Sequence, residues 1–333
     1  MLKEFLSLVY FSLYKTNKLL YDKGFLKAYS PKSFFVIGVG NLSVGGSGKT
    51  PFVVLLSKYL DKKNKKHCVV SRGYKKKLPG NYIINNQNIN NFNPQNVGDE
   101  PFMLAKELPH SSIYVGDKLK NIKEAEKKQL YSHVIIDDAY QSFGIVKNYN
   151  VLLIDFSVNL KKYCLLPKGF LREPLSEIKR ANLIVFTKTN LISQSDYKLK
   201  KAFFKKYINP DKQSVVTSII KSNLYFENKN KLNPVKEGPL SKKYISFSGI
   251  GNPKSFSAIQ KKLSLVPLKN FVFKDHYNYP KKTIQKLLSF CKTNSIQTIL
   301  TTKKDYYKIS SCFKSFKIYV LDIEHELLDD FNF

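Results

Sequence analysis

The chain has 333 residues, enough for two domains or one large one, and its hydrophobic content of 43% supports a real core. Its 56 Lys and Arg residues against 25 Asp and Glu give a formal net charge of +31. Because the lysines are dispersed along the chain, this charge does not single out nucleic acid; an anionic membrane surface or a phosphorylated substrate fits it equally well. The four scattered cysteines have neither metal-ligand nor redox spacing, so we interpret them as incidental thiols in a reducing compartment.

Residues 1–30 are predicted to contain a basic helix, because Leu, Phe and Tyr recur near helical spacing between lysines. The densest apolar run, residues 5–14, is ten residues long, which is too short to span a bilayer. No small-residue cleavage site follows it, which argues against a signal peptide. Spacing alone leaves two interpretations open: a helix at the membrane interface, or a helix packed on the protein's own core.

The next stretch has the pattern of a phosphate-binding loop. An apolar run, residues 34–39, predicts a buried strand; a Gly-rich turn and Gly48-Lys49-Thr50 follow, and residues 52–60 predict a helix. Glycines let backbone N–H groups close on an anion, Lys49 can reach the β- and γ-phosphates, and the Thr50 hydroxyl can bind Mg²⁺. The candidate nucleotide-binding residues are Ser43, Val44, Gly45, Gly46, Ser47, Gly48, Lys49 and Thr50. Ser43 stands where the usual spacing has Gly, and the alternative is a Gly-rich turn that binds nothing.

Carboxylates follow at two further places. An apolar strand, residues 131–136, ends in Asp137 and Asp138, where an α/β nucleotide-binding fold carries its Mg²⁺-handling Asp; the alternative is a plain strand-end turn. Residues 97–101 open a helix with Asp99 and Glu100 in its first turn, where carboxylates either complement the helix dipole or act in catalysis. Both alternatives stay open from composition alone.

Further strands alternate with helices, and this predicts an α/β fold with a P-loop NTPase-like parallel sheet. The strands are expected at residues 67–71, 151–155 and 183–187, and residues 81–96, rich in Asn, are expected to form a loop. Thr187-Lys188-Thr189-Asn190 faintly resembles the guanine-reading motif of GTPases, but Asn190 replaces the Asp that contacts guanine. We therefore interpret it as a strand end.

After about residue 220 the composition changes, and a second α/β series begins. Residues 222–240 predict a hairpin or linker, residues 244–249 a strand, and residues 317–321 the last strand. His276, beside Asp275 in a polar and aromatic loop, is a candidate for chemistry or a structural histidine. The expected division is an N-terminal interfacial helix (1–30), a nucleotide-binding domain (31–220) and a smaller α/β/α domain (221–333), with a soft boundary because a C-terminal strand can return to the first sheet.

Taken together, these segments resemble one family, the tetraacyldisaccharide 4'-kinases of lipid A biosynthesis. The resemblance runs in order over nearly the whole chain, and Ser43 supports it because that family also has a hydroxyl residue there. The motifs that carry it are residues 40–51, 71–74, 98–101, Asp137-Asp138 with Gln141, 165–167, 171–174, 249–253, Asp275-His276 and 301–305. Two departures put substrate contacts in doubt: Ala139-Tyr140-Gln141-Ser142 replaces a Gly-Leu-Gln-His-like run, and Lys118 replaces an Arg.

The resemblance implies a Mg²⁺- and ATP-dependent lipid kinase that phosphorylates the 4'-hydroxyl of a tetraacyldisaccharide 1-phosphate and so gives lipid IVA. It implies Asp99 as the base with His276 as its partner, Thr50, Asp137 and Asp138 at the metal, and Arg72, Arg172 and Glu173 lining the substrate site. The implied location is the cytoplasmic face of the bacterial inner membrane, held peripherally (monotopically) on its anionic surface, with no nucleic acid and no obligate protein partner. The alternative is a regulatory or assembly P-loop NTPase that acts on a protein partner.

Overall fold

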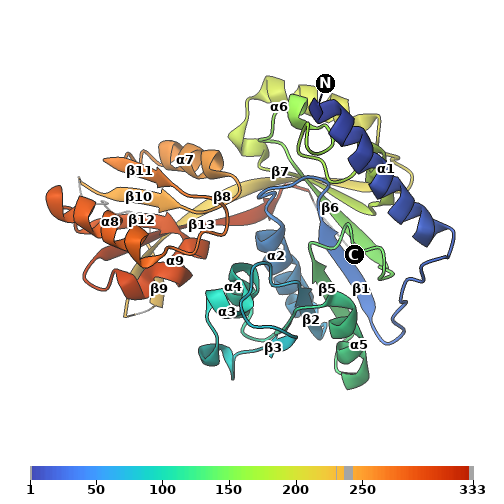
Figure 1. The fold of residues 1–333 in the computed structure, drawn as a ribbon, viewed down its shortest axis with the longest axis horizontal. Coiled ribbons are helices and arrows are strands. Elements are labelled where there is room, and N and C mark those ends of the chain that lie inside the picture. Colours follow the sequence, from blue (N-terminus) through green and yellow to red (C-terminus); the bar gives the residue numbers. More distant parts are fainter. Residues whose placement is uncertain (1, 230, 236–242, 330–333) are drawn as a thin grey trace.

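The structure, a computed structural model, describes residues 2–229, 231–235 and 243–329. Two lobes lie side by side and share one sheet (Figure 1), whose strand order is β11-β10-β12-β13-β8-β7-β6-β1-β5-β2-β4-β3, with β9 paired to β8. The predicted α/β class with a P-loop NTPase-like parallel sheet is confirmed in the first lobe, where all neighbouring strands but the edge strand β3 pair in parallel.

The first lobe is built around β1 (Phe35–Gly40), which lies between β5 (His133–Asp137) and β6 (Tyr149–Asp155). The sheet continues through β2 (His67–Ser71) and β4 (Ser112–Val115) to β3 (Tyr82–Ile84), and on the other side through β7 (Leu183–Thr187). Alternate residues of β1 enter different cores, Ile37 with α2 and Val36 with α5, so helices cover both faces. Burial on both faces explains the near-continuous apolar runs in these strands.

The helices of this lobe are α2 (Lys49–Lys62), α3 (Pro94–Val97), α4 (Asp99–Glu107), α5 (Lys118–Lys128) and α6 (Gln194–Lys205). The Asn-rich segment 81–96, expected to be a loop, instead contains β3, a 3₁₀ turn and the start of α3. Its strand is short, and its asparagines serve as caps: the Asn93 side chain accepts a hydrogen bond from the backbone N–H of Asn96. The composition favoured a loop because asparagine is common both at helix N-caps and in turns, so its presence does not distinguish a capped helix from a loop.

The second lobe repeats the alternation on a smaller scale. Its strands β11 (Lys269–Val272), β10 (Ile245–Ser248) and β12 (Thr298–Thr302) pair in parallel, and α7 (Pro253–Lys262), α8 (Lys281–Thr293) and α9 (Lys303–Ile309) accompany them. The predicted strand at 244–249 is thus present. The predicted hairpin at 222–240 is present as the pairing of β8 with β9 (Lys231–Pro234), and residues 236–240 lie outside the described part.

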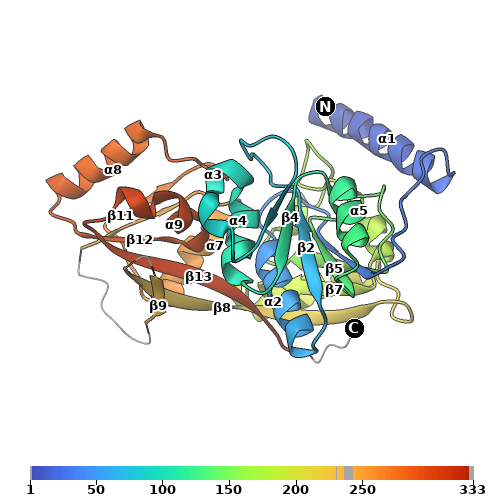
Figure 2. The same cartoon turned by 90° about the horizontal axis from the view of Figure 1, so that it is seen from below.

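Two long strands join the lobes (Figure 2). β8 (Ser214–Asn228) starts parallel to β7 in the first lobe, and β13 (Lys317–Leu327) starts parallel to β12 in the second. β8 and β13 pair antiparallel, from Ser218 opposite Leu327 to Phe226 opposite Tyr319. β13 therefore extends six residues beyond its predicted end at Leu321. The division of the chain into domains near residue 220 stays a prediction.

Helix α1 (Leu2–Asp22) lies along one side of the first lobe (Figures 1 and 2). Its half-buried side carries Ser7, Tyr10, Tyr14 and Tyr21, while none of its residues is fully buried. Over residues 2–329, apart from the two short gaps, no helix combines the length and the apolar character needed to cross a bilayer.

Candidate active site

The phosphate-binding loop connects β1 to α2, as its sequence pattern predicts. Gly45 and Gly48 have φ of 104° and 88°, the left-handed region that favours glycine. Lys49 is the first residue of α2, and its Nζ lies 3.2 Å from Asn41 Oδ1 and 3.5 Å from Asp138 Oδ1. The first turn of α2 therefore places unpaired N–H groups and an ammonium at one point, an arrangement suited to phosphate.

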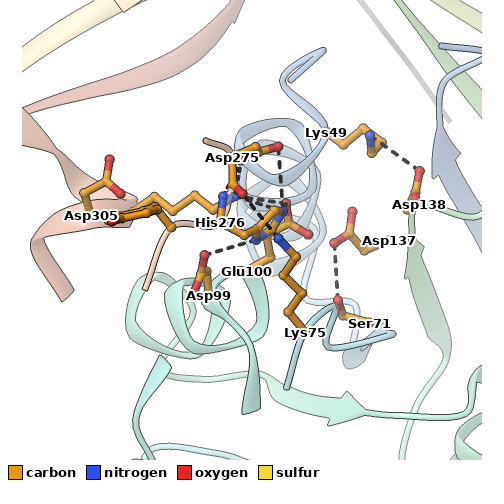
Figure 3. Close-up of polar contacts among 12 residues, drawn as sticks. Lys49, Ser71, Lys75, Asp99, Glu100, Asp137, Asp138, Asp275, His276 and Asp305 are labelled. Atoms are coloured by element: carbon orange, nitrogen blue, oxygen red, sulfur yellow. Dashed lines mark hydrogen bonds and ion pairs between the residues drawn. The ribbon is translucent and has the colours of Figure 1, made fainter. Parts of the chain in front are cut away.

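Two buried oxygens beside this loop have no partner within the described ranges: Ser47 Oγ and Asp137 Oδ1. Ser71 Oγ donates to the other oxygen of Asp137 at a long 3.4 Å (Figure 3). Burial raises the pKa of Asp137, and the neighbouring carboxylates of Glu100 and Asp138 raise it further. A buried acid with an orphaned oxygen beside a nucleotide loop fits a hard divalent cation, which prefers oxygen ligands.

Asp138 is held differently from its neighbour. Arg172 donates to both of its oxygens, at 2.9 and 3.1 Å, and its backbone has φ of 49°. Burial opposes ionisation, but Lys49 and Arg172 outweigh it and hold the pKa of Asp138 well below its usual range. Both oxygens of Asp138 are thus bound by Arg172, whereas Asp137 has only one long hydrogen bond, from Ser71.

The three predicted substrate residues have different surroundings. Arg172 is engaged by Asp138 and Asn41, while Glu173 is fully buried, ion-paired with Arg180 and bonded by Tyr14 of α1. Burial raises the pKa of Glu173. Arg72 is exposed just after β2. Their predicted roles in substrate binding stay predictions.

Lys118, the departure from the expected Arg, lies under Asp138: its Nζ donates to the Asp138 carbonyl at 2.6 Å and to Ser142 Oγ at 3.3 Å. Burial lowers its pKa, although Asp138 and Asp137 oppose that shift. Lys118 therefore links the end of β5, which carries Asp137 and Asp138, to Ser142. Ser142 belongs to the segment that replaces the expected Gly-Leu-Gln-His-like run.

Asp99 and His276, which lie 177 positions apart in sequence, meet between the lobes (Figure 3). Asp99 is the first residue of α4, and its Oδ2 lies 3.1 Å from His276 Nδ1. His276 has φ of 57°, and the Tyr74 ring packs edge-on against the imidazole at 5.0 Å. A backbone strained in this way is typical of functional positions, where surrounding contacts hold it in place.

Two lysines of α9 that sequence reasoning left without a role complete this cluster. Lys308 Nζ lies 2.7 Å from Asp99 Oδ2, and Lys304 Nζ lies 3.3 Å from His276 Nε2. Burial raises the pKa of Asp99, but the bond from His276 and the charges of Lys308 and Lys304 reverse this, so its net pKa is lowered. Lys304 belongs to the 301–305 motif, and Lys308 follows it at helical spacing, but neither pattern indicated a contact with Asp99 or His276.

The second lobe also touches the phosphate loop directly. A Cβ added to Gly251 would lie 2.8 Å from the Gly46 nitrogen, and the Asn252 side chain donates to Ser157 Oγ at 3.3 Å. On its other side the loop is held by His325 of β13, whose Nε2 lies 2.9 Å from the Gly48 carbonyl oxygen. Since a carbonyl only accepts, His325 Nε2 carries the proton, and Nδ1 accepts from Ser218 Oγ at 2.8 Å.

Asn190, which departs from the guanine-reading motif, is occupied by structure. Its amide donates to the Ile220 carbonyl at 2.8 Å and its oxygen accepts from the Ile220 N–H at 3.1 Å, so it ties the end of β7 to β8. The preceding Lys188 pairs with Asp155 at 2.6 Å and donates to the Gly46 carbonyl. The interpretation of this segment as a strand end agrees with these contacts.

A Gly-rich loop between a buried parallel strand and a helix, with Lys-Thr at the helix start and carboxylates at the neighbouring strand end, defines the class of P-loop nucleotide-binding proteins. An acid and an imidazole facing that loop point within this class to phosphoryl transfer to an acceptor. The family model described as Tetraacyldisaccharide-1-P 4'-kinase matches residues 1–333, and the chain belongs to this family.

Its relatives agree with this assignment. The chain is 34% identical over 310 residues to the tetraacyldisaccharide 4'-kinase of Aquifex aeolicus, covering 91% of this chain and 88% of the relative. It is 29% identical over 320 residues to the enzyme of the same name from Bdellovibrio bacteriovorus, covering 92% and 89%. The crystal structure of LpxK from Aquifex aeolicus in complex with ATP is similar with a TM-score of 0.73 and 31% identity, covering 98% of this chain and 95% of that one. The resemblance stated from sequence motifs is confirmed.

Proposed function

We propose that this chain transfers the γ-phosphoryl group of ATP to the 4'-hydroxyl of a tetraacyldisaccharide 1-phosphate, giving lipid IVA in lipid A biosynthesis. Membership of the kinase family supports the reaction, and ATP bound to the similar Aquifex structure supports the nucleotide. The observation on which the proposal most depends is the Asp99–His276 pair beside the phosphate loop. An NTPase that acts on a protein partner has no need of a base for a sugar hydroxyl.

The phosphate loop would bind the triphosphate. The backbone N–H groups of residues 43–50 would surround its oxygens, and Lys49 would exchange its contacts with Asn41 and Asp138 for the β- and γ-phosphates. Thr50, Asp137 and Asp138 supply oxygen ligands of the kind that Mg²⁺ prefers, and the orphaned Asp137 oxygen fits that role. When bound, the cation would neutralise charge on the phosphates.

Asp99 would accept the proton of the sugar hydroxyl. His276 and Lys308 both approach Oδ2, and within the described residues Oδ1 makes no hydrogen bond, so Oδ1 is the oxygen left for the substrate. A carboxylate with a lowered pKa is a weak base but is fully ionised at neutral pH. Because Asp99 and His276 come from different lobes, the pair depends on the lobes staying together as they are in this structure, and this contact would also exclude water from the phosphoryl group.

Helix α1 supports a peripheral position on the anionic inner-membrane surface, at its cytoplasmic face. Its polar and aromatic side contacts the protein: Tyr10 donates to the Arg172 carbonyl at 2.7 Å and Ser7 to the Leu165 carbonyl at 3.2 Å. Its aliphatic side is open, with Leu2 72% and Leu13 67% exposed. Exposed leucines interspersed with exposed lysines, such as Lys3 and Lys15, suit an anionic bilayer interface, where a four-chain acceptor stays.

The test is direct phosphorylation of lipid. Purified protein is incubated with γ-labelled ATP, Mg²⁺ and tetraacyldisaccharide 1-phosphate in mixed micelles or anionic vesicles, and the products are separated by thin-layer chromatography. The proposal requires label in a lipid product, and loss of that label when Mg²⁺ is chelated. Release of free phosphate alone, with or without lipid, would favour the alternative NTPase.

Flotation with the same vesicles tests the membrane role of α1, where Leu13→Ser should weaken binding and the half-buried Ser7→Ala should not.

A further inference from the structure

We propose that Lys308 is a positioning residue for the general base: it orients the Asp99 carboxylate across the contact between the lobes and supplies the positive charge that keeps this carboxylate ionised. The inference depends on the proposed role of Asp99. With Lys308, the Asp99–His276 pair becomes a set of three interacting groups. The sequence does not distinguish Lys308 from the many other lysines of the chain.

The geometry at Lys308 is that of a fully enclosed ammonium. Its side chain is 1% exposed, although it lies on a helix of the smaller lobe. Nζ lies 2.7 Å from Asp99 Oδ2, 3.0 Å from the Tyr277 carbonyl and 3.7 Å from Asp305 Oδ1. Two of these oxygens are at hydrogen-bond distance and two of the three belong to carboxylates, so the position suits a charged lysine.

Lys308 and His276 share one oxygen of Asp99. With Oδ2 contacted by both, rotation of the carboxylate would break two contacts at once, so both oxygens are held in their present positions. His276 alone is a single contact on a loop residue with strained backbone, whereas Lys308 comes from a helix. Precise placement of a base within hydrogen-bond reach of its substrate has large kinetic consequences.

The charge of Lys308 also acts on the ionisation of Asp99. A carboxylate this buried would hold its proton more tightly than in water, and a cation within about 4 Å typically lowers such a pKa by roughly 1–3 units. Lys308 is the nearer of two lysines that act on Asp99, and the net pKa of Asp99 is lowered despite burial. The charged or titratable groups near Asp99 are of two kinds: the basic groups are His276, Lys304 and Lys308, and the acidic groups are Glu100, Asp275, Tyr279 and Asp305.

Removing the lysine charge should therefore change how activity depends on pH. In Lys308→Met the burial of Asp99 is no longer offset by its nearest cation, so the pKa of Asp99 should rise and the base should become protonated at a higher pH than in the wild type. The ratio of kcat/KM in the variant to that in the wild type should fall between pH 7.5 and pH 5, by up to about tenfold. Taking the ratio cancels titrations common to both proteins, among them that of Asp137. A lysine that only stabilises the fold would give a ratio independent of pH.

Two more variants complete the experiment. Lys308→Arg keeps the charge and should hold the ratio nearly constant with pH, while Lys314→Met, on an exposed lysine of the same lobe, should match the wild type. Combining Lys308→Met with Asp99→Asn should lower kcat no further than Asp99→Asn alone, because groups acting as a unit are not additive. If Lys308→Met does not fold, Lys308→Gln replaces it, since its amide can still donate to the Tyr277 carbonyl.

The outcomes separate this inference from the proposed function. A pH-independent ratio in a folded Met or Gln variant, or full additivity with Asp99→Asn, overturns the role of Lys308 while leaving the kinase proposal intact. If Asp99→Asn itself retains normal kcat, the base assignment fails and the role of Lys308 fails with it. If the wild type labels no lipid, the proposed function fails.

Discussion

The phosphate loop and the acid–base cluster are two parts of one site that are built in opposite ways. The loop is a single stretch of the first lobe, residues 41–48 between β1 and α2, continued by Lys49 and Thr50 at the start of α2. The cluster takes Asp99 from the first lobe and His276, Lys304 and Lys308 from the second. A local element needs only its own sequence to form, whereas the cluster exists only if the lobes are correctly placed. Binding of nucleotide and activation of the acceptor should therefore be separable by mutation.

The largest effect is expected at Lys49. In Lys49→Ala the triphosphate loses the ammonium that would face its β- and γ-oxygens, and both ATP affinity and turnover should fall, with kcat/KM lower by ~10³-fold. Steady-state lipid phosphorylation and calorimetric titration of ATP measure the two losses. Lys62→Ala, at the exposed end of the same helix, is the matched control. Unchanged ATP affinity in Lys49→Ala would mean that the loop does not bind the triphosphate.

A smaller effect is expected at His325, which ties the strands joining the lobes to the loop. Burial lowers the pKa of His325 to about 4, with Lys188 lowering it further and the Gly48 carbonyl and Asp155 opposing this. The unfolded chain binds a proton near pH 6.5 and the folded chain does not, so stability is fully present above about pH 6.5 and is lost as the pH falls toward 4.

Replacing this histidine should remove that loss. Between pH 7.5 and 4.5 the free energy of unfolding of the wild type should decrease by about 2–3 kcal/mol more than that of His325→Gln. Glutamine can still donate to the Gly48 carbonyl, so ATP affinity should be nearly kept, whereas His325→Leu should weaken it. Urea unfolding at the two pH values is the measurement, and equal losses in the wild type and His325→Gln would show that the imidazole is not buried in the neutral form.

The smallest effect is expected where the lobes touch at Gly251. A Cβ there would lie within 3 Å of the Gly46 nitrogen and of Asp275 Oδ2, so Gly251→Ala should hold the lobes slightly apart. ATP binding to the loop should be little changed, while kcat should fall about tenfold because a base misplaced by a fraction of an ångström is inefficient. A fall in ATP affinity with normal kcat would show that the contact serves the nucleotide and not the closure.

The phosphate loop and the acid–base cluster also differ in how far the sequence predicts them. The strand, Gly turn, Lys49-Thr50 and helix are contiguous, and Asp137-Asp138 follow an apolar strand, so their placement follows from local rules. Asp99 with His276 required the family resemblance, because nothing local relates residues 177 positions apart. The fold class followed from the alternation of apolar strands with helices, which is also a local pattern.

Other features had no local signal. Lys308 looks like any lysine in a chain with 56 Lys and Arg residues, and only burial against Asp99 distinguishes it. The extra length of β13 depends on pairing with β8, which is a long-range property. Glu173, expected near substrate, is buried in an ion pair with Arg180, and sequence gives charge without giving its partner.

The most direct measurement of the whole account is a kinetic cycle on Asp99 and His276. Asp99→Ala, His276→Ala and the double variant are compared with the wild type for kcat of lipid phosphorylation and for ATP affinity. We expect each single change to lower kcat by at least ~10²-fold. The double variant should be lower than the less active single variant by no more than a few fold, and ATP affinity should be nearly unchanged. Near-normal kcat in either single variant, with the protein folded and ATP bound, would contradict the account.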